Sequence, residues 1–378
     1  MKYCKECLTT NLRPNASLNT DSVCIACEYA NADGKSFESN LNILKSMIQK
    51  NKSKRKKHQK YDCIVGVSGG KDSTRQAHWV RDRLGLNPLL VCCGYPPLQM
   101  TDIGAENMSN LISMGFDIEI ITPAPQSSAQ LSLSSFRQFG NVCKSTEMAL
   151  YSAVPRAAIL KKIPLVLWGE NDAFQVGDAA VEGENYFDGN NSRNLNTLTE
   201  GGIRWIFDDI DSFKAQTYIY PSKIDFDKAK LDIMYLGPAW DDWSMDENSI
   251  YAALTGLTLR PDDIDITGDI SGASMLDEEF TNINMMIKYY KFGFGRATDI
   301  CNWRIRTGVL SREKAIKLVK KYDGVCDDSI ILRYCNYVNI SIAEFWDIVN
   351  LYVNHDIFNI EEGERPKNKF TVGVDFEY

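Results

Sequence analysis

The sequence lacks any apolar run close to the roughly 18–20 residues that a membrane-spanning helix requires. Its amino-terminal stretch is polar and carries Cys4 and Cys7, which does not match a secretory signal. Histidine is scarce, because the chain has only His58, His78 and His355, and their spacing matches no metal-binding pattern. These absences predict a cytoplasmic protein that does not contact a membrane and has no histidine-ligated metal.

Acidic residues outnumber basic ones, which gives the 378 residues a net charge of −8. A net negative charge is unfavourable for a protein that binds nucleic acid, so we do not expect a nucleic-acid partner. One basic block, residues 50–60, holds seven Lys or Arg side chains. We interpret the block as a solvated linker or helix end, and a patch for nucleic acid or an acidic partner is the alternative.

The eleven cysteines do not suggest a disulfide scaffold, because their number is odd and the chain is long. Cys4, Cys7, Cys24 and Cys27 form two CxxC pairs separated by 16 residues, a spacing typical of a four-thiolate zinc site. We predict a structural Zn²⁺ in a zinc ribbon at 1–35, with an iron–sulfur cluster or unligated thiols as alternatives. Four further cysteines are expected to be small core residues: Cys143, Cys301, Cys326 and Cys335.

Strand and helix patterns alternate over residues 61–240, after a helical and basic linker at 36–60. The expected strands are 61–67, 88–93, 117–121 and 164–168, and the expected helices between them lie near 73–85, 102–115 and 144–162. The alternation predicts an α/β fold with a parallel sheet covered on both faces. Residues 171–202 are rich in Asn, Gly, Asp and Ser, so we expect a long loop that closes over a substrate. Residues 241–378 are predicted to be mainly helical.

The segment Ser68-Gly69-Gly70-Lys71-Asp72-Ser73 links the first expected strand to the first helix of this domain. Adjacent glycines allow the backbone to approach an anion closely, and the helix that follows offers free N–H groups and a positive dipole end. The segment therefore predicts a loop that binds a nucleotide phosphate. It is not a Walker A loop, because Lys71 is followed by Asp72 and not by Ser or Thr.

Within this loop, the Ser68 and Ser73 hydroxyls are expected to bind phosphate oxygens, and Lys71 adds a point charge. Asp72 either caps or braces the helix, or reaches the phosphates through Mg²⁺.

Gly169 and Glu170 follow another expected strand, so they should meet the phosphate loop at the carboxyl edge of the sheet. Glu170 either orients a loop there or binds Mg²⁺ or substrate. A separate cluster, Lys291, Arg296 and Asp299, lies beside two glycines at a helix start and suits a pyrophosphate or a nucleotide-sugar diphosphate. Surface ion pairs are the alternative for this cluster.

Together these motifs resemble the N-acetyl sugar amidotransferases of the PP-loop (ATP pyrophosphatase) superfamily, which act in bacterial surface-sugar pathways. The resemblance rests on the cysteine ribbon, the Ser68–Ser73 loop, and the segments 165–171, 291–299, 311–313, 319–324 and 344–346. It implies a PP-loop core similar to the adenine nucleotide alpha hydrolases, with ATP and Mg²⁺ as cofactors. It also implies that Asp72, Lys71 and Glu170 are catalytic.

The resemblance further implies conversion of the acetamido group of a nucleotide-activated sugar into an acetamidino group, in the synthesis of LPS O-antigen or flagellin sugars. ATP would be split into AMP and pyrophosphate, and ammonia would displace AMP from an adenylated imidate. A glutaminase subunit related to that of imidazole-glycerol-phosphate synthase would supply the ammonia, because three histidines leave no room for a Cys–His–Glu glutaminase domain in this chain.

Two other functions remain open at this stage. A tRNA-thiolating PP-loop enzyme also adenylates a carbonyl oxygen, and the basic block with Cys143 and Cys301 would favour it. The acidic net charge and the lack of a clear catalytic cysteine pair are against it. A non-catalytic zinc-ribbon interaction protein would leave the phosphate loop unexplained.

Overall fold

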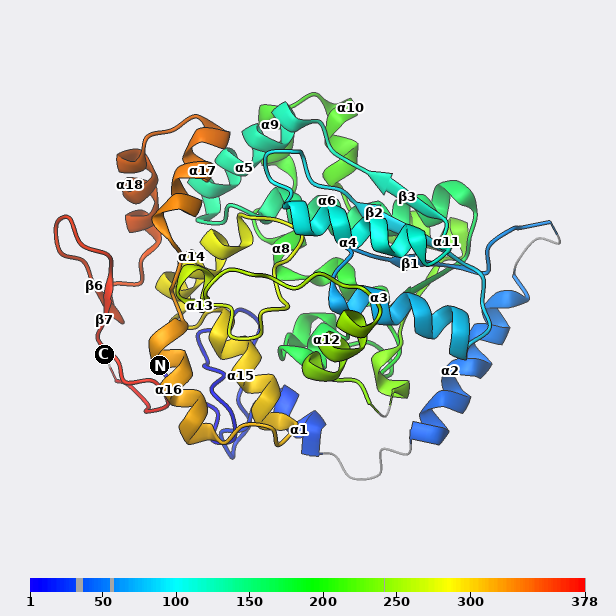
Figure 1. Ribbon diagram of the computed structural model, residues 1–378, viewed down its shortest axis with the longest axis horizontal. Coiled ribbons are helices and arrows are strands. Elements are labelled where there is room, and N and C mark those ends of the chain that lie inside the picture. The colour runs from blue at the N-terminus through cyan, green and yellow to red at the C-terminus, as the bar shows by residue number, and fades with distance from the viewer. Residues whose placement is uncertain (32–36, 55–57, 241, 378) are drawn as a thin grey trace.

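The computed structural model describes residues 1–31, 37–54, 58–240 and 242–377. Part of the predicted basic linker, residues 55–57, lies outside the described residues, as does the predicted border between ribbon and linker at 35/36. In Figure 1 a central sheet with its covering helices occupies one side of the molecule, and the carboxyl-terminal helices occupy the other.

The sheet is five-stranded and parallel, in the order β3-β2-β1-β4-β5. Its strands are β1 (Cys63–Gly66), β2 (Pro88–Cys93), β3 (Ile118–Ile121), β4 (Leu165–Trp168) and β5 (Asp232–Tyr235). The predicted parallel α/β fold is confirmed, and the four expected strands are present. The strand β5 was not predicted, because four residues in an otherwise polar region give too short an apolar pattern.

Helices cover both faces of this sheet (Figure 1). They are α2 (Phe37–Lys52), α3 (Lys71–His78) with the π-turn η1 (Trp79–Arg83), α4 (Asp102–Ser113), α6 (Lys144–Lys161) and α11 (Lys223–Ala229). Successive strand residues point to opposite faces, so Val65 packs with α2, α3 and α4, whereas Ile64 packs with α6 and α11. Both faces are therefore buried, as the predicted alternation requires.

The strands β1 and β4 are neighbours although about 100 residues separate them in the chain. Ile64 pairs with Val166, which places the carboxyl ends of the two strands side by side. Gly66 allows this close approach, because a Cβ there would lie 2.8 Å from Nε1 of Trp168. The connection that follows β1 leads to β2 on one side of β1, and β4 lies on its other side. A crevice therefore opens between the carboxyl ends of β1 and β4.

Residues 171–202 contain several short helices where a long loop was expected. These are α7 (Asp172–Gln175), η2 (Ala179–Val181), η3 (Asn190–Asn194) and α8 (Asn196–Thr199). Val181 and Leu198 are buried in one core with α6 and with the helices that follow, α9 (Arg204–Asp209), α10 (Ser212–Ala215) and η4 (Gln216–Tyr218). The segment is thus anchored by its apolar side chains.

The carboxyl-terminal region forms a second, helical core. The helices that contribute to this core are α13 (Ile264–Thr267), α14 (Thr281–Phe292), α15 (Arg296–Arg306), α16 (Arg312–Tyr322), α17 (Asp328–Val338) and α18 (Ile342–Tyr352). The region also contains η5 (Gly237–Ala239), α12 (Met245–Leu254), β6 (Phe358–Asn359) and β7 (Lys367–Asn368). The helix α5 (Pro125–Phe139) joins this core through Phe136. Ser341 caps α18 as its sequence predicts, because its Oγ accepts a 3.0 Å hydrogen bond from Glu344 N.

The cysteine-rich segment before and including α1 (Ile25–Asn31) packs on this helical core (Figure 1). Tyr3 and Leu8 are buried in the core, and Leu8 N donates a 2.7 Å hydrogen bond to Asn302 Oδ1 of α15. The ribbon therefore shares its apolar core with distant parts of the chain. Among the described residues no helix is both long and apolar enough to cross a membrane.

Candidate active site at the carboxyl edge of the sheet

The Ser68–Ser73 loop turns directly from β1 into α3. Gly69 has φ +84°, a conformation that favours glycine, and a Cβ there would lie 3.2 Å from Met108 N. Gly70 is the N-cap of α3 and has no side chain with which to satisfy the first N–H groups of the helix. These groups and the helix dipole remain available to an anion, so the local backbone suits a phosphate.

Two hydroxyl groups hold the shape of this loop. Ser73 Oγ donates to Gly70 O at 3.1 Å and accepts from Ser68 N at 3.3 Å, and Ser68 Oγ accepts from Gly70 N at 3.3 Å. The loop is therefore braced by its own side chains.

Asp72 lies in the first turn of α3, and both of its carboxylate oxygens are engaged. Lys71 Nζ donates to Oδ2 at 2.5 Å, and Asn248 Nδ2 donates to Oδ1 at 2.8 Å. Asn248 Oδ1 in turn accepts from Arg75 Nη1 at 2.7 Å. Lys71 is only 5% exposed. The helix α12 thus fixes the orientation of Asp72, a role for Asn248 that no local sequence pattern indicates.

A cavity of about 290 Å³ lies in front of the loop, between β1, β4 and α6. Its wall includes the predicted residues Ser68, Asp72, Ser73, Gly169 and Glu170. The structure therefore brings together two segments that lie about 100 residues apart, as expected for the carboxyl edge of a parallel sheet.

Two further carboxylates, Asp172 and Asp277, line the same cavity. Asp172 follows the predicted strand by only four residues, and its position could have been inferred from that spacing. Asp277 comes from the segment before α14, and nothing near it in the sequence indicates its place. Tyr95 Oη donates to Asp277 Oδ2 at 3.1 Å, which fixes that carboxyl group.

Burial and mutual repulsion make these carboxyl groups harder to ionise. Burial, and next the charge of Asp72, raise the pKa of Glu170 to about 8. Burial, and next Asp178, raise the pKa of Asp172 to about 6. Burial also raises the pKa of Asp277. Such a cluster of buried carboxyl groups supplies the oxygen ligands that a hard divalent cation prefers, and Mg²⁺ is the biological ion of that kind that accompanies phosphates.

A second, more apolar cavity of about 240 Å³ adjoins the loop on the side of β2 and β3. Gly94, Met108 and Ile120 contribute to its lining, and it shares Ser68 and Asp277 with the first cavity. Its volume and lining suit a largely apolar ring beside the Ser68–Ser73 loop.

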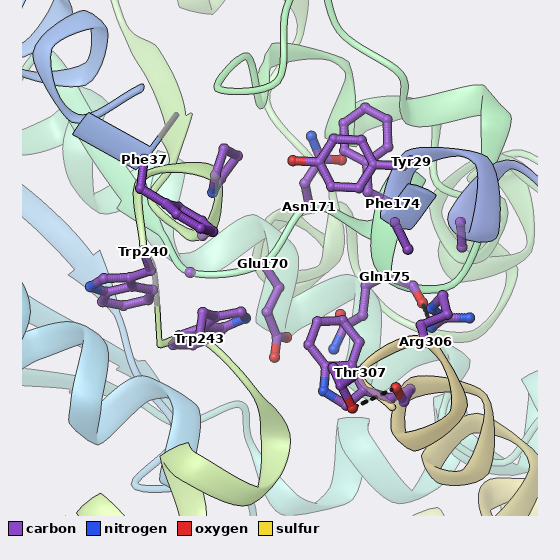
Figure 2. Close-up of a pocket in the computed structure, with 16 residues that line it drawn as sticks. Tyr29, Phe37, Glu170, Asn171, Phe174, Gln175, Trp240, Trp243, Arg306 and Thr307 are labelled. Carbon is purple, nitrogen blue, oxygen red and sulfur yellow. Dashed lines mark hydrogen bonds between the residues drawn. The ribbon is translucent and has the colours of Figure 1, made fainter. Parts of the chain in front are cut away.

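A third cavity, also of about 240 Å³, opens on the other side of Glu170 (Figure 2). In that view Glu170 stands between two groups of aromatic side chains: Phe37, Trp240 and Trp243 on one side, and Tyr29 and Phe174 on the other. The cavity shares Gly169 and Glu170 with the cavity in front of the phosphate loop. We call it the aromatic cavity.

The predicted cluster Lys291, Arg296 and Asp299 does not converge on one point. Lys291 Nζ donates to Phe139 O at 2.7 Å, and Arg296 Nε donates to Ser274 Oγ at 3.0 Å. Asp299 pairs with Arg13 and lies 3.8 Å from Lys288 Nζ.

These two cations hold the pKa of Asp299 below its usual range, although burial acts against them. Lys291 and Lys288 line a larger cavity of about 580 Å³ together with Glu147 and Glu200, so this cavity carries charge of both signs.

The cysteines Cys4, Cys7, Cys24 and Cys27 form a buried cluster whose sulfur atoms lie within 4.8 Å of one another. The Sγ atoms of Cys7 and Cys24 are 3.7 Å apart, and those of Cys4 and Cys27 are 4.0 Å apart. A tetrahedral zinc site with Zn–S bonds of about 2.3 Å requires sulfur atoms about 3.8 Å apart. The donor set and its spacing therefore fit Zn²⁺, as the sequence predicts.

Four cysteines outside the cluster were predicted to be core residues, and all four are buried: Cys143, Cys301, Cys326 and Cys335. Burial raises the pKa of Cys301 and Cys326 to about 12 and that of Cys335 to about 11, and it also raises the pKa of Cys143. A buried thiol with a raised pKa is a poor nucleophile.

Comparison with known protein families gives one match, over residues 277–371, to the family described as "LPS biosynthesis protein WbpG-like, C-terminal domain". The matched segment begins at Asp277, which lies in the wall of the cavity in front of the Ser68–Ser73 loop, and it includes α14 to α18. No curated protein matches the chain.

Proposed function

We propose that this chain is an ATP-dependent sugar amidotransferase that acts in the synthesis of a lipopolysaccharide or related surface glycan. The observation that carries the proposal is the Ser68–Ser73 loop, which faces one cavity with Glu170 and with Asp277 of the WbpG-like segment. The loop supports nucleotide binding, and the family match supports the glycan pathway.

In this proposal ATP lies across the two cavities that share Ser68. Its adenine occupies the apolar cavity beside Met108 and Ile120, and its β- and γ-phosphates bind the loop N–H groups at the start of α3. Lys71 and the Ser73 hydroxyl add charge and a hydrogen bond. The α-phosphate then faces Glu170.

The carboxylates of this cavity require a counter-ion when ATP is present. Asp72 and Asp277 are the side chains that would hold Mg²⁺. When bound, Mg²⁺ would neutralise phosphate charge and make pyrophosphate a better leaving group. Asn248 and Lys71 keep the Asp72 carboxylate oriented for this role.

The first chemical step activates the acetamido group. Its oxygen forms a bond to the α-phosphorus, the bond between the α- and β-phosphates breaks, and pyrophosphate leaves. The amide nitrogen loses its proton, and the product is an O-adenylyl imidate. A glutamate with a pKa of about 8, such as Glu170, is a stronger base than an exposed one and can accept this proton.

The second step replaces oxygen with nitrogen. Ammonia adds to the imidate carbon, the carbon–oxygen bond breaks, and AMP leaves, so that an acetamidino group remains. A separate glutaminase subunit is proposed as the source of ammonia. The ring nitrogens of His78 lie 2.8 Å from Tyr251 Oη and 3.0 Å from Met114 Sδ, so this buried histidine is not part of a Cys–His pair.

The thiolation alternative would require an accessible thiolate of lowered pKa. Cys93 lines the cavity in front of the Ser68–Ser73 loop, yet burial raises the pKa of its thiol to about 12. The ammonia-dependent reaction is therefore the better supported of the two.

The test is to incubate the purified chain with ATP, ammonium chloride and a panel of nucleotide-linked N-acetyl sugars. We expect AMP and pyrophosphate in equal amounts, and a sugar product lighter by the difference between O and NH. Chromatography with mass spectrometry measures both. ADP with inorganic phosphate as the products would refute the PP-loop mechanism.

A further inference from the structure

We infer that the aromatic cavity binds the pyranose ring of the acceptor and presents its acetamido group to Glu170. This inference rests on the proposed function and assigns a place to its second substrate. Four features of the cavity support it: its lining, its size, a polar side chain in its wall and its position.

The lining is aromatic from several directions. Trp240 and Trp243 stack with ring centroids 4.2 Å apart, and Tyr29 stacks on Phe174 with centroids 4.0 Å apart. Trp303 of α15 adds a further indole. The faces of aromatic rings carry partial negative charge, and the axial C–H groups of a pyranose carry partial positive charge, so the two surfaces attract each other.

The size of the cavity suits one sugar ring. Its volume of about 240 Å³ is below the roughly 300 Å³ at which pockets for drug-sized ligands begin. A complete nucleotide sugar does not fit inside it, but a single N-acetylhexosamine unit does. Thr307, at the rim, is exposed, so the nucleotide carrier can extend from there toward solvent.

Arg306, in the wall of the cavity, can select a hydroxylated ligand. Its Nη2 donates a 2.7 Å hydrogen bond to Gln175 O, and the guanidinium carries four further N–H groups that can donate to the oxygens of a sugar.

The position of the cavity fixes the orientation of the sugar. Gly169 and Glu170 belong both to this cavity and to the cavity in front of the phosphate loop. In Figure 2 the indole nitrogen edge of Trp243 faces Glu170. An acetamido group attached to a ring in the aromatic cavity can reach the α-phosphate along this shared edge.

The larger cavity near Lys288 is a poorer choice for the acceptor. Its cations already have partners, because Lys291 donates to Phe139 O and Lys288 lies beside Asp299. Glu147 and Glu200 in its wall would repel a diphosphate.

Saturation-transfer NMR tests the inference with the ATP analogue and the sugar probe present in the same sample. The full chain is mixed with α,β-methylene-ATP, which cannot be split between these phosphates, and with one of three probes: UDP-N-acetylglucosamine, UDP-N-acetylgalactosamine or CMP-N-acetylneuraminic acid. We expect saturation at the adenine protons, and at the ring and acetyl methyl protons of at least one probe.

Trp303→Ala and Phe37→Ala remove aromatic rings on separate helices that line the cavity. Each should lower the sugar signal about five-fold, the loss expected for one aromatic contact, and leave the adenine signal unchanged. Phe213→Ala is the matched control, because Phe213 is 90% exposed on α10. The adenine signal also shows that each variant is folded.

Sugar signals that persist in both cavity variants would overturn the inference. So would the absence of sugar saturation for all three probes while the adenine protons respond. If instead the adenine protons fail to respond in the unaltered chain, the ATP site of the proposed function fails. The response of the sugar signals to Trp303→Ala and Phe37→Ala then still decides the inference.

Discussion

Asn248 Nδ2 of α12 donates a 2.8 Å hydrogen bond to Asp72 Oδ1 in the first turn of α3, across 176 positions of the sequence. The bond connects the carboxyl-terminal half of the chain to the phosphate loop. It orients a carboxylate that would otherwise be held by Lys71 alone.

Asn248→Ala should therefore slow ATP cleavage without unfolding the chain. Loss of a hydrogen bond to a charged group costs about 1.5–3 kcal/mol, which corresponds to roughly a 10- to 100-fold loss of kcat/KM for ATP. A pyrophosphate-release assay measures it. Ser249→Ala on the same helix is the control, because its hydroxyl bonds to Met245 O of its own helix. Equal activity of the two variants would contradict the role of Asn248.

Asp72→Ala and Ser73→Ala should lower AMP formation more than they lower stability. Ser73 braces the loop through Gly70 O, and both Asp72 and Ser73 line the cavity in which the proposed function places the phosphates. Product chromatography and thermal unfolding separate the two effects. If activity falls only in proportion to the folded fraction, these residues are structural and not catalytic.

Glu170→Gln should change how stability depends on pH. The pKa of Glu170 is about 8 in the fold and about 4.5 when unfolded, so the folded state binds the extra proton between these values. This term lowers the free energy of unfolding as pH rises from about 4.5 to 8, by on the order of 1–3 kcal/mol. The Glu170→Gln variant lacks this pH-dependent contribution. It should therefore be more stable than the unaltered chain at pH 8.5 but not at pH 5.

Urea unfolding at the two pH values measures this difference, with Glu362→Gln at an exposed position as the control. A gap between the unaltered chain and Glu170→Gln that is the same at both pH values would contradict the raised pKa.

The cysteine cluster should hold one Zn²⁺ per chain, and Cys24→Ser should remove it. The ribbon packs on α15 and α16, because Leu8 N bonds to Asn302 and Arg312 Nε bonds to Cys7 O at 3.2 Å. Faster hydrogen exchange should therefore spread from residues 1–31 into these two helices and spare the parallel sheet. Elemental analysis identifies the metal, and iron, or no metal, would contradict the assignment.

Ammonia as the nitrogen donor predicts that cysteine nucleophiles are dispensable. Each of four Cys→Ser variants should keep most of the ammonium-dependent activity: Cys143, Cys301, Cys326 and Cys335. Glutamine should support the reaction only when a glutaminase partner is added. Loss of activity in two or more variants with unchanged circular dichroism would favour sulfur chemistry instead.

The parts of the site that depend on short stretches of sequence could be predicted. Ser68–Ser73 and Gly169–Glu170 each follow an apolar strand, and the rules for parallel sheets place both at one edge. The four-cysteine site could be predicted equally well, because the spacing of the cysteines alone indicates a metal site.

The rest depends on contacts between distant segments and could not be predicted. Asn248, Asp277 and Trp303 lie in ordinary helical or loop sequence, and only the fold brings them to the phosphate loop or beside Glu170. Lys291, Arg296 and Asp299 show the opposite case. They are close in sequence, yet their bonds run to Phe139, Ser274 and Arg13, because each side chain meets a partner from a different distant segment of the chain.

Asp277 opens the segment that resembles the WbpG-like domain, and Trp303 lies within it. The border that sequence comparison draws therefore runs through the candidate active site and not through a connecting loop away from it. A natural recombination that exchanged this segment would replace one wall of the cavity in front of the Ser68–Ser73 loop and one wall of the aromatic cavity together. Under the proposed function, acceptor preference and the geometry of ATP cleavage would therefore be inherited as a single trait, and a chimaera of two relatives joined at this border would have to restore both.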